Sequence, residues 1–155
     1  MTLYIDGDAF PNLLKPVLLR AIDRLAIPTC VIANKRVTIG PSKHITYIIV
    51  GSGSDEADHR IVELVQEGEL VITADIPLAD RVITKKALAI NHRGEPFTEE
   101  NIKDILSMRN LMQEFRDCGE FTKGPAPLSQ KDVSKFANKV NQILTKISPP
   151  KKPTK

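Results

Sequence analysis

The sequence lacks the features that mark membrane, secreted and disulfide-stabilised proteins. No apolar stretch approaches the roughly 20 residues of a membrane span, because Lys, Asp or Pro interrupts the longest runs. The amino terminus enters a strand-like segment directly, without the basic and apolar regions of a signal peptide. Two cysteines, Cys30 and Cys118, are too few for a disulfide framework and lack the spacing of a zinc site. Together these absences predict a cytoplasmic protein with reduced thiols.

The sequence also contains no internal repeat, and its length of 155 residues suits one domain with a hydrophobic core. We expect residues 1–147 to form this domain. Residues 148–155 combine proline and lysine without any apolar side chain to pack, so they are predicted to be a disordered basic tail. Nothing in the sequence indicates the oligomeric state.

Charge is distributed unevenly along the chain. Residues 123–155 hold eight lysines and one acidic residue, a net charge of +7, whereas residues 1–122 hold 14 basic and 18 acidic residues, a net charge of −4. An acidic body with a basic carboxyl-terminal segment points towards a nucleic-acid partner. Lys131, Lys135 and Lys139 share one face of a predicted helix at i, i+4 spacing. This face is either a contact surface for nucleic acid or an ordinary solvent-exposed helix face.

Strand-like and helix-like segments alternate over the first ninety residues. Short apolar runs rich in Val, Ile and Thr predict five strands buried on both faces: Thr2–Asp6, Thr29–Ala33, Ile45–Val50, Leu70–Thr73 and Ala87–Ile90. Amphipathic segments between them predict three helices: Asn12–Leu25, Asp55–Gln66 and Pro77–Lys86. This alternation predicts a parallel sheet with right-handed crossovers.

Two regions depart from this alternation. Residues 34–44 contain Gly40-Pro41 and are typical of a loop, with room for one further short strand. After residue 91 the pattern is helical, with Thr98 as the expected N-cap of one helix. Ser129 opens a capping-box-like sequence before the last helix.

Acidic residues follow three of the predicted strands. Ligands of an open parallel sheet bind at the carboxyl ends of its strands, so these side chains are expected to meet at one edge. The residues in question are Asp6, Asp8, Asp55, Asp58, Asp75 and Asp80. Carboxylates held together raise one another's pKa and destabilise the fold unless a cation neutralises them. Ligands that are oxygen only select Mg²⁺ or Mn²⁺ over zinc, which predicts a metal site formed by Asp6, Asp8, Asp55, Asp58 and Asp75.

Helix capping is the alternative interpretation of these acids. Asp is a preferred N-cap residue, and Asp75 before Ile76-Pro77 is a good cap candidate by itself. Asp6, Asp8 and Asp58 exceed what capping requires, so the set as a whole favours a metal site.

A basic residue is expected at the same edge. Arg93, in "NHRGEPF", follows the fifth predicted strand. It is a candidate phosphate contact, and a solvated loop explains it equally well.

Several motifs together resemble the YaiI/YqxD family of uncharacterised bacterial proteins. They are "YIDGDAFP" (4–11), "SDEADHRIV" (54–62), "GELVITADIPLADRVITKKALAIN" (68–91), "RGEPFTEENI" (93–102), "LSMRNLMQEFR" (106–116) and "GPAPLSQKDVSKFANKVNQIL" (124–144). The resemblance covers nearly the whole chain. It implies an α/β, PIN-like three-layer fold: a mostly parallel five-stranded sheet in the order 3-2-1-4-5, flanked by helices, with a helical carboxyl-terminal part.

The resemblance also implies a site, because PIN-domain proteins are commonly Mg²⁺- or Mn²⁺-dependent ribonucleases with clustered acids. Asp6 matches the first of these acids, Asp75 the acid after the "T-x-D" strand, and Asp80 the acid beyond it. Asp55 or Asp58 would supply the acid on the intervening helix, and we take Asp58 as the catalytic one.

Three positions near the predicted site depart from the family pattern. Phe10 stands where the family usually has Cys, so any role of that thiol is absent from this chain. His92 stands where the family usually has Pro, and Gly7 replaces an Ala between the first two acids.

Three functions are compatible with these observations. The first is a divalent-metal-dependent nuclease that hydrolyses phosphodiester bonds in RNA, with Arg93 and the lysines at 131, 135 and 139 holding the strand. The second is a non-catalytic module that binds nucleic acid or protein. The third is an aspartate-based phosphatase with Asp6 as nucleophile, although later strand ends lack convincing Ser/Thr and Lys motifs.

Overall fold

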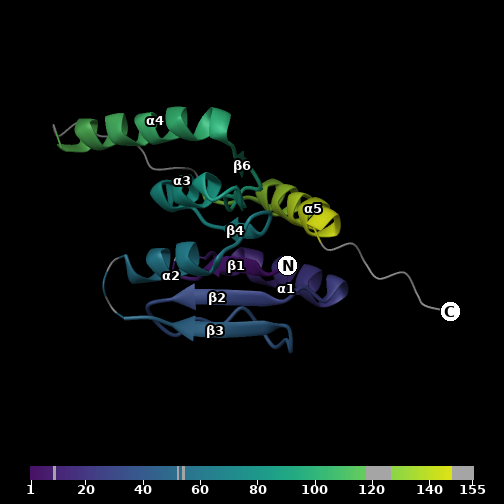
Figure 1. Cartoon of the computed structure of the whole chain (residues 1–155). Helices are drawn as coiled ribbons and strands as arrows, with labels where there is room; N and C mark the ends of the chain where they lie inside the picture. Colours follow the sequence, from purple (N-terminus) through teal and green to yellow (C-terminus); the bar gives the residue numbers. More distant parts are fainter. Residues whose placement is uncertain (9, 52, 54, 118–126, 148–155) are drawn as a thin grey trace.

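Strand β1 (Leu3–Asp6) lies inside a six-stranded sheet in the order β3-β2-β1-β4-β5-β6 (Figure 1). The structure is a computed structural model that describes residues 1–8, 10–51, 53, 55–117 and 127–147. The other strands are β2 (Thr29–Ala33), β3 (Ile45–Ile49), β4 (Leu70–Ile72), β5 (Leu88–Ile90) and β6 (Pro96–Phe97). The first five are parallel, and β6 pairs antiparallel with β5. The predicted parallel order 3-2-1-4-5 is therefore confirmed.

The sixth strand was not predicted. β6 has two residues and begins with Pro96, so it carries no periodic signal and pairs only at the edge, where proline is tolerated. Residues 34–44, by contrast, form a loop without the additional strand for which they had room. The Tyr47 hydroxyl of β3 holds this loop by accepting a hydrogen bond from the Ile39 N–H at 3.0 Å.

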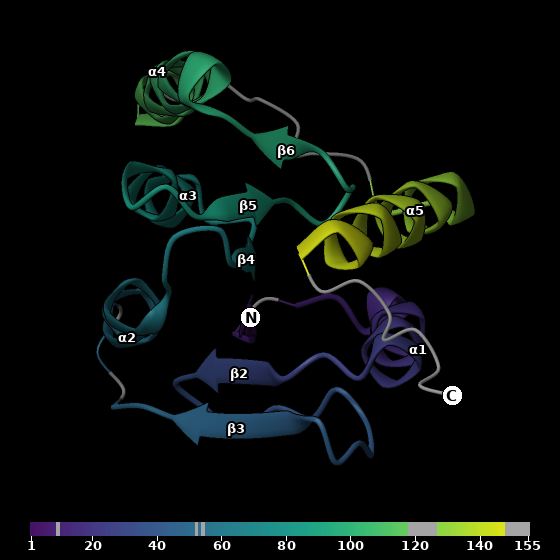
Figure 2. The same ribbon diagram turned by 45° about the vertical axis from the view of Figure 1, so that its right-hand side comes forward.

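Helices cover both faces of the sheet and complete three layers (Figure 2). A short 3₁₀ turn (Asn12–Leu14) precedes the first of five helices: α1 (Lys15–Leu25), α2 (Glu56–Leu64), α3 (Ile76–Thr84), α4 (Glu99–Asp117) and α5 (Gln130–Ile147). On one face α1 and α5 pack on Leu3, Ile5 and Ile72, with Phe136 of α5 fully buried. On the other face α2 and α3 pack on Ile32 and other alternate residues of the same strands. Burial on both faces explains why the strands are apolar throughout.

The predicted starts of the last two helices are confirmed, whereas the helix predicted from Asn12 begins at Lys15 after the 3₁₀ turn. Thr98 and Asn101 cap α4 reciprocally: the Asn101 N–H donates to Thr98 Oγ1 at 3.0 Å, and the Thr98 N–H to Asn101 Oδ1 at 2.8 Å. Ser129 and Asp132 form the expected capping box of α5, in which the Ser129 N–H donates to Asp132 Oδ2 at 3.0 Å.

Other sequence predictions meet the structure only in part. Cys30 is a free, buried thiol in β2, while Cys118 and the predicted tail 148–155 lie outside the described residues. None of the helices in the described part of the chain has the length and apolar character needed to cross a membrane.

The turn between β5 and β6 packs directly on the backbone of α5. Asn91 Oδ1 closes the turn by accepting hydrogen bonds from the N–H groups of Arg93 and Glu95 at 2.9 and 3.0 Å. Gly94 has φ +78°, and a Cβ there would lie 2.8 Å from the Lys135 carbonyl oxygen. Glycine is therefore required at position 94 both for its conformation and for this close approach.

Replacing Gly94 is expected to loosen the contact between this turn and α5. Gly94→Ala should lower the free energy of unfolding by about 2–4 kcal/mol, because left-handed backbone strain and a steric clash add together. Urea denaturation measures the change. The control is Gly51→Ala, where the nearest atom to an added Cβ is 3.9 Å away. Equal stability of the two variants would contradict the assigned packing.

Candidate functional site

The centre of the candidate site is the junction of β1 and β4. The two strands pair in parallel with Ile5 opposite Ile72, which places Asp6 beside Thr73 at the carboxyl edge of the sheet. The Thr73 side chain is fully buried, and its hydroxyl donates to Asp6 Oδ2 at 2.9 Å. The Thr73 hydroxyl oxygen in turn accepts a hydrogen bond from the Asp75 backbone N–H at 2.9 Å. One hydroxyl thus fixes both acids.

Asp75 is a helix cap and a member of the acidic edge at once. Its Oδ1 accepts a hydrogen bond from the Leu78 N–H at 2.9 Å at the start of α3, as the capping interpretation predicts. Its charge also raises the pKa values of Asp6 and Asp58. The two interpretations of this residue are therefore compatible.

Asp8 also has a structural contact, and the residue before it is a glycine for steric reasons. Asp8 Oδ1 accepts a hydrogen bond from the Asn34 N–H at 2.8 Å, which ties the chain after β1 to the end of β2. The Gly7 N–H still pairs with the Ile32 carbonyl at 2.9 Å, and an added Cβ would lie 2.9 Å from Val31 Cγ1. Gly7 is thus needed for close packing on β2.

Burial and the charges of neighbouring carboxylates raise the pKa values of Asp58 and Asp6. Burial, followed by the charges of Asp75, Asp6 and Asp55, raises the pKa of Asp58 at the start of α2 to about 6, against the opposing effect of Arg81. Burial is also the main cause that raises the pKa of Asp6, with added repulsion from Asp8 and Asp75. The hydrogen bond from Thr73 partly offsets this rise. Five of the six acids predicted to share one edge therefore interact electrostatically.

The acidic edge supplies donors of the type that a hard cation requires. All five groups are carboxylates, which suit Mg²⁺ or Mn²⁺. Within the described residues, no group of three or more His, Cys, Asp or Glu side chains stands ready to hold a metal ion. The residues thus fit the ion in chemistry, and binding one would require their side chains to converge.

Asp80 has a different partner. It lies in α3 with its Oδ1 3.8 Å from Lys103 Nζ of α4, and it is not among the charges that shift the pKa of Asp6 or Asp58. Its predicted catalytic role stays a prediction.

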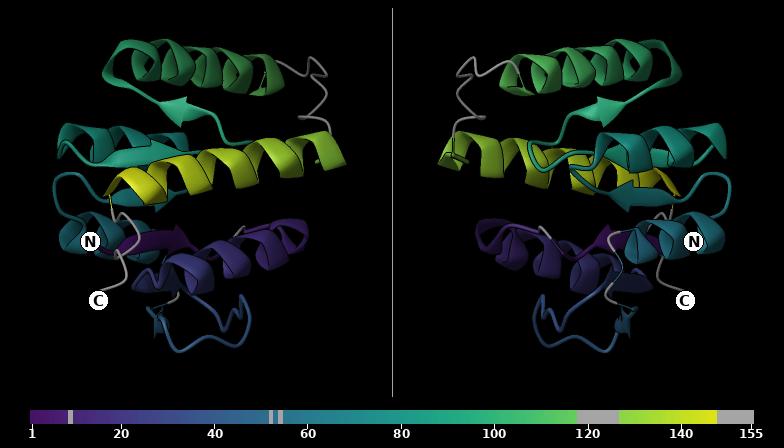
Figure 3. Two further views of the ribbon diagram at one scale, coloured as in Figure 1. Left: turned by 90° about the vertical axis from the view of Figure 1, so that its right-hand side faces the viewer. Right: turned by 90° about the vertical axis from the view of Figure 1, so that its left-hand side faces the viewer.

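Three of the predicted basic residues lie in α5, and the fourth, Arg93, contacts it. Arg93 donates from a guanidinium nitrogen to Asp132 Oδ2 at 2.6 Å, so it joins the β5–β6 turn to the first turn of α5. Lys131 and Lys135 are exposed and Lys139 is half-buried. Figure 3 shows the amino-terminal end of α5 on the side of the molecule towards which the parallel strands point.

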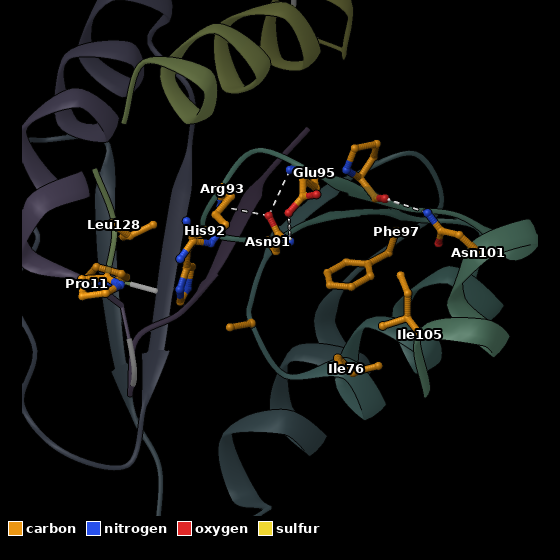
Figure 4. Close-up of a pocket in the computed structure, with 13 residues that line it drawn as sticks. Pro11, Ile76, Asn91, His92, Arg93, Glu95, Phe97, Asn101, Ile105 and Leu128 are labelled. Carbon is orange, nitrogen blue, oxygen red and sulfur yellow. Dashed lines mark hydrogen bonds between the residues drawn. The ribbon is translucent and has the colours of Figure 1, made fainter. Parts of the chain in front are cut away.

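A cavity of about 650 Å³ adjoins the acidic edge between the β5–β6 turn, α4 and the start of α5 (Figure 4). His92 is one of its lining residues. Its ring meets that of Phe10 edge to face, with centroids 5.6 Å apart at 85°. His92 Nε2 is buried and has no hydrogen-bond partner among the described residues. Burial lowers the pKa of His92 to about 4, so the ring is neutral at pH 7.

The sequence indicated the acids but not the side chain that arranges two of them, Thr73. Its hydroxyl group, placed between a strand and the acidic cap of the next helix, was the feature that could have indicated this role. The cavity joins residues from distant parts of the chain, and no local pattern marks it.

Fold and site together define an α/β protein with a PIN-like strand order and a cluster of interacting carboxylates at the carboxyl edge of its sheet. A family model described as "Uncharacterized BCR, YaiI/YqxD family" matches residues 4–146, so the chain belongs to this family.

Relatives in other bacteria resemble the chain over nearly its whole length. A UPF0178 protein of Sulfurovum sp. is 63% identical over 94% of this chain and 99% of its own. A UPF0178 protein of Sulfurimonas denitrificans is 62% identical over 94% and 97%. One from Shewanella amazonensis is 50% identical over 95% and 99%. No solved structure matches the chain.

The role of Thr73 can be tested through the titration of Asp6. Thr73→Val removes the hydroxyl that donates to Asp6, so the pKa of Asp6 should rise further, whereas Thr73→Ser should leave it near the wild-type value. Thr73→Val should also cost about 1–3 kcal/mol of stability, because it leaves Asp6 Oδ2 and the Asp75 N–H without this partner. Carboxyl ¹³C NMR titration and urea unfolding measure the two effects. Similar Asp6 titrations in both variants would contradict the assignment.

Burial of His92 predicts a loss of stability in acid. Above pH 6.5 the ring is neutral in both the folded and the unfolded chain. As the pH falls from 6.5 to about 4, only the unfolded chain gains the proton, so the folded state loses about 1–2 kcal/mol after allowance for solvent screening. Urea unfolding at pH 7.5 and 4.5 should show a smaller acid loss in His92→Leu than in wild type. The exposed His59, as His59→Leu, is the control and should retain the wild-type loss.

Proposed function

We propose that this protein is a divalent-metal-dependent nuclease that hydrolyses phosphodiester bonds in RNA. The main support is the cluster of Asp6, Asp8, Asp55, Asp58 and Asp75, in which burial and the neighbouring negative charges together raise the pKa values of Asp6 and Asp58. A helix cap explains the presence of an acid at Asp75, and a loop hydrogen bond explains Asp8. Within the described residues, neither kind of contact explains the other three acids. Carboxylates that repel one another without structural need are typical of a functional site.

In this proposal the five carboxylates would hold Mg²⁺ or Mn²⁺, and the chemistry that such an ion would supply is activation of a water and stabilisation of the leaving oxygen of the phosphodiester. Thr73 orients Asp6 and Asp75 through its single hydroxyl. Asp58, in the first turn of α2, would complete the metal site or position the water. Asp80 is a further catalytic candidate from α3, and its ion pair with Lys103 would have to open.

The basic residues divide into two roles. Lys131, Lys135 and Lys139 offer positive charge for the phosphate backbone along α5, where at least the first two are well exposed. Arg93 is bound to Asp132 at the first turn of α5, so we assign it the role of holding that helix in place beside the site.

Cleavage of a labelled single-stranded RNA oligonucleotide tests the proposal. Wild type should cleave with Mn²⁺ or Mg²⁺ and not with EDTA, and Asp6→Asn should reduce the rate by at least about 100-fold, because it removes a charge at the centre of the cluster. The matched control is Asp104→Asn, an exposed acid on α4 outside the cluster, which should retain full activity.

Equal rates for wild type and Asp6→Asn would contradict the nuclease assignment. Salt-sensitive RNA binding that survives Asp6→Asn, without cleavage by either protein, would instead support the non-catalytic binding module, for which the exposed lysines of α5 are the relevant surface.

A further inference from the structure

The cavity beside the acidic edge has walls from four parts of the chain. Ile76 begins α3, Phe97 ends β6, Ile105 lies in α4, and Leu128 precedes α5. Figure 4 shows these side chains around one space, with Phe97, Ile105 and Ile76 on one side and Pro11 and Leu128 on the other. Its volume of about 650 Å³ lies in the range of about 300–1,000 Å³ that is typical of small-molecule sites.

Several residues that line the cavity are close neighbours in sequence of the acids at the edge of the sheet. Ala74 and Ile76, which both line it, flank Asp75 directly, and Pro11 lies three residues after Asp8. The lining of the cavity and the acidic edge therefore share the segments that follow β1 and β4.

The lining selects against an anion. Arg93 is the cationic side chain among the described lining residues, and it is bound to Asp132. Glu95 is acidic, and His92, which has a lowered pKa, is neutral at pH 7. The acidic edge nearby adds further negative charge. A phosphate or carboxylate is thus disfavoured here, and an uncharged group is favoured.

Polar groups at fixed positions accompany the apolar walls. Asn101 Oδ1 accepts from the Thr98 N–H, and its Nδ2 donates to the Pro96 carbonyl at 3.1 Å, so the amide is held rigidly at the cavity. Asn101 Nδ2 carries a second N–H beyond that bond. Asn91 is held in the same way by the β5–β6 turn. The cavity therefore suits a flat, uncharged group with apolar faces and a polar edge.

We infer that this cavity binds a single unpaired nucleobase of the strand whose phosphodiester lies at the acidic edge. The inference rests on the proposed function and names the part of the substrate that the site recognises. A nucleobase is neutral and planar, stacks on aromatic rings such as those of Phe97 and His92, and accepts or donates hydrogen bonds at its edge. The base would fill the cavity while its own phosphate reaches the carboxylates.

Nucleoside binding in EDTA tests this inference without metal or catalysis. Adenosine, cytidine and uridine are titrated separately into ¹⁵N-labelled wild-type protein, with methyl β-D-riboside as the control that lacks a base. We expect the amide signals of Ala74, Phe97 and Asn101 to shift with the nucleosides and to stay unchanged with the riboside. Shifts confined to residues outside the cavity, or equal shifts with the riboside, would overturn the inference.

A matched pair of variants on α4 sharpens the test. Ile105→Trp should fill the cavity and weaken nucleoside binding at least tenfold, whereas Met108→Trp, at an exposed position one turn further along, should bind as wild type does. Equal binding by both folded variants counts against the base pocket. The wild-type shift map decides the question even if Ile105→Trp fails to fold.

The outcomes separate this inference from the proposed function. Nucleoside binding in the cavity of a protein that cleaves no RNA would contradict the nuclease assignment and leave the base pocket standing. Metal-dependent RNA cleavage by a protein that binds no nucleoside would contradict the base pocket alone.

Discussion

The parallel pairing of β1 with β4 is the constraint on which the acidic edge depends. It sets Asp6 beside Thr73, whose hydroxyl has one proton to donate and gives it to Asp6 while it accepts the Asp75 N–H. Because the strands are parallel, their carboxyl ends leave the sheet on one side, where Asp8 and the start of α2 also arrive. A slip of one residue in this pairing would turn Asp6 away from that edge.

The same arrangement shows why Asp6 and Asp58 are more informative than their neighbours. Asp75 and Asp8 each accept a backbone hydrogen bond that stabilises the fold, so loss of either changes structure and charge together. Asp6 is held by a side-chain hydroxyl, and Asp58 lies in the first turn of α2 with its pKa raised to about 6. Burial and charge repulsion together raise the pKa values of these two residues.

Much of this architecture was predictable because its signals are local. Apolar β-branched runs marked the five parallel strands, and paired capping residues marked the starts of α4 and α5. The strand ends then predicted which acids share an edge. What could not be predicted depends on contacts between distant residues. Strand β6 forms through the pairing of Pro96 and Phe97 with β5. The ion pair of Arg93 with Asp132, and that of Asp80 in α3 with Lys103 in α4, likewise join residues from different elements.

The contact between Phe10 and His92 links two positions that depart from the pattern of the family. The residues are far apart in sequence, yet their rings meet edge to face beside the cavity. A cysteine at position 10 would offer no ring, and a proline at position 92 would offer no imidazole. Each departure therefore changes the surroundings of the other, and together they reshape the wall next to Pro11. Phe10 and His92 thus define the character of the wall next to the carboxyl end of β1 in this chain.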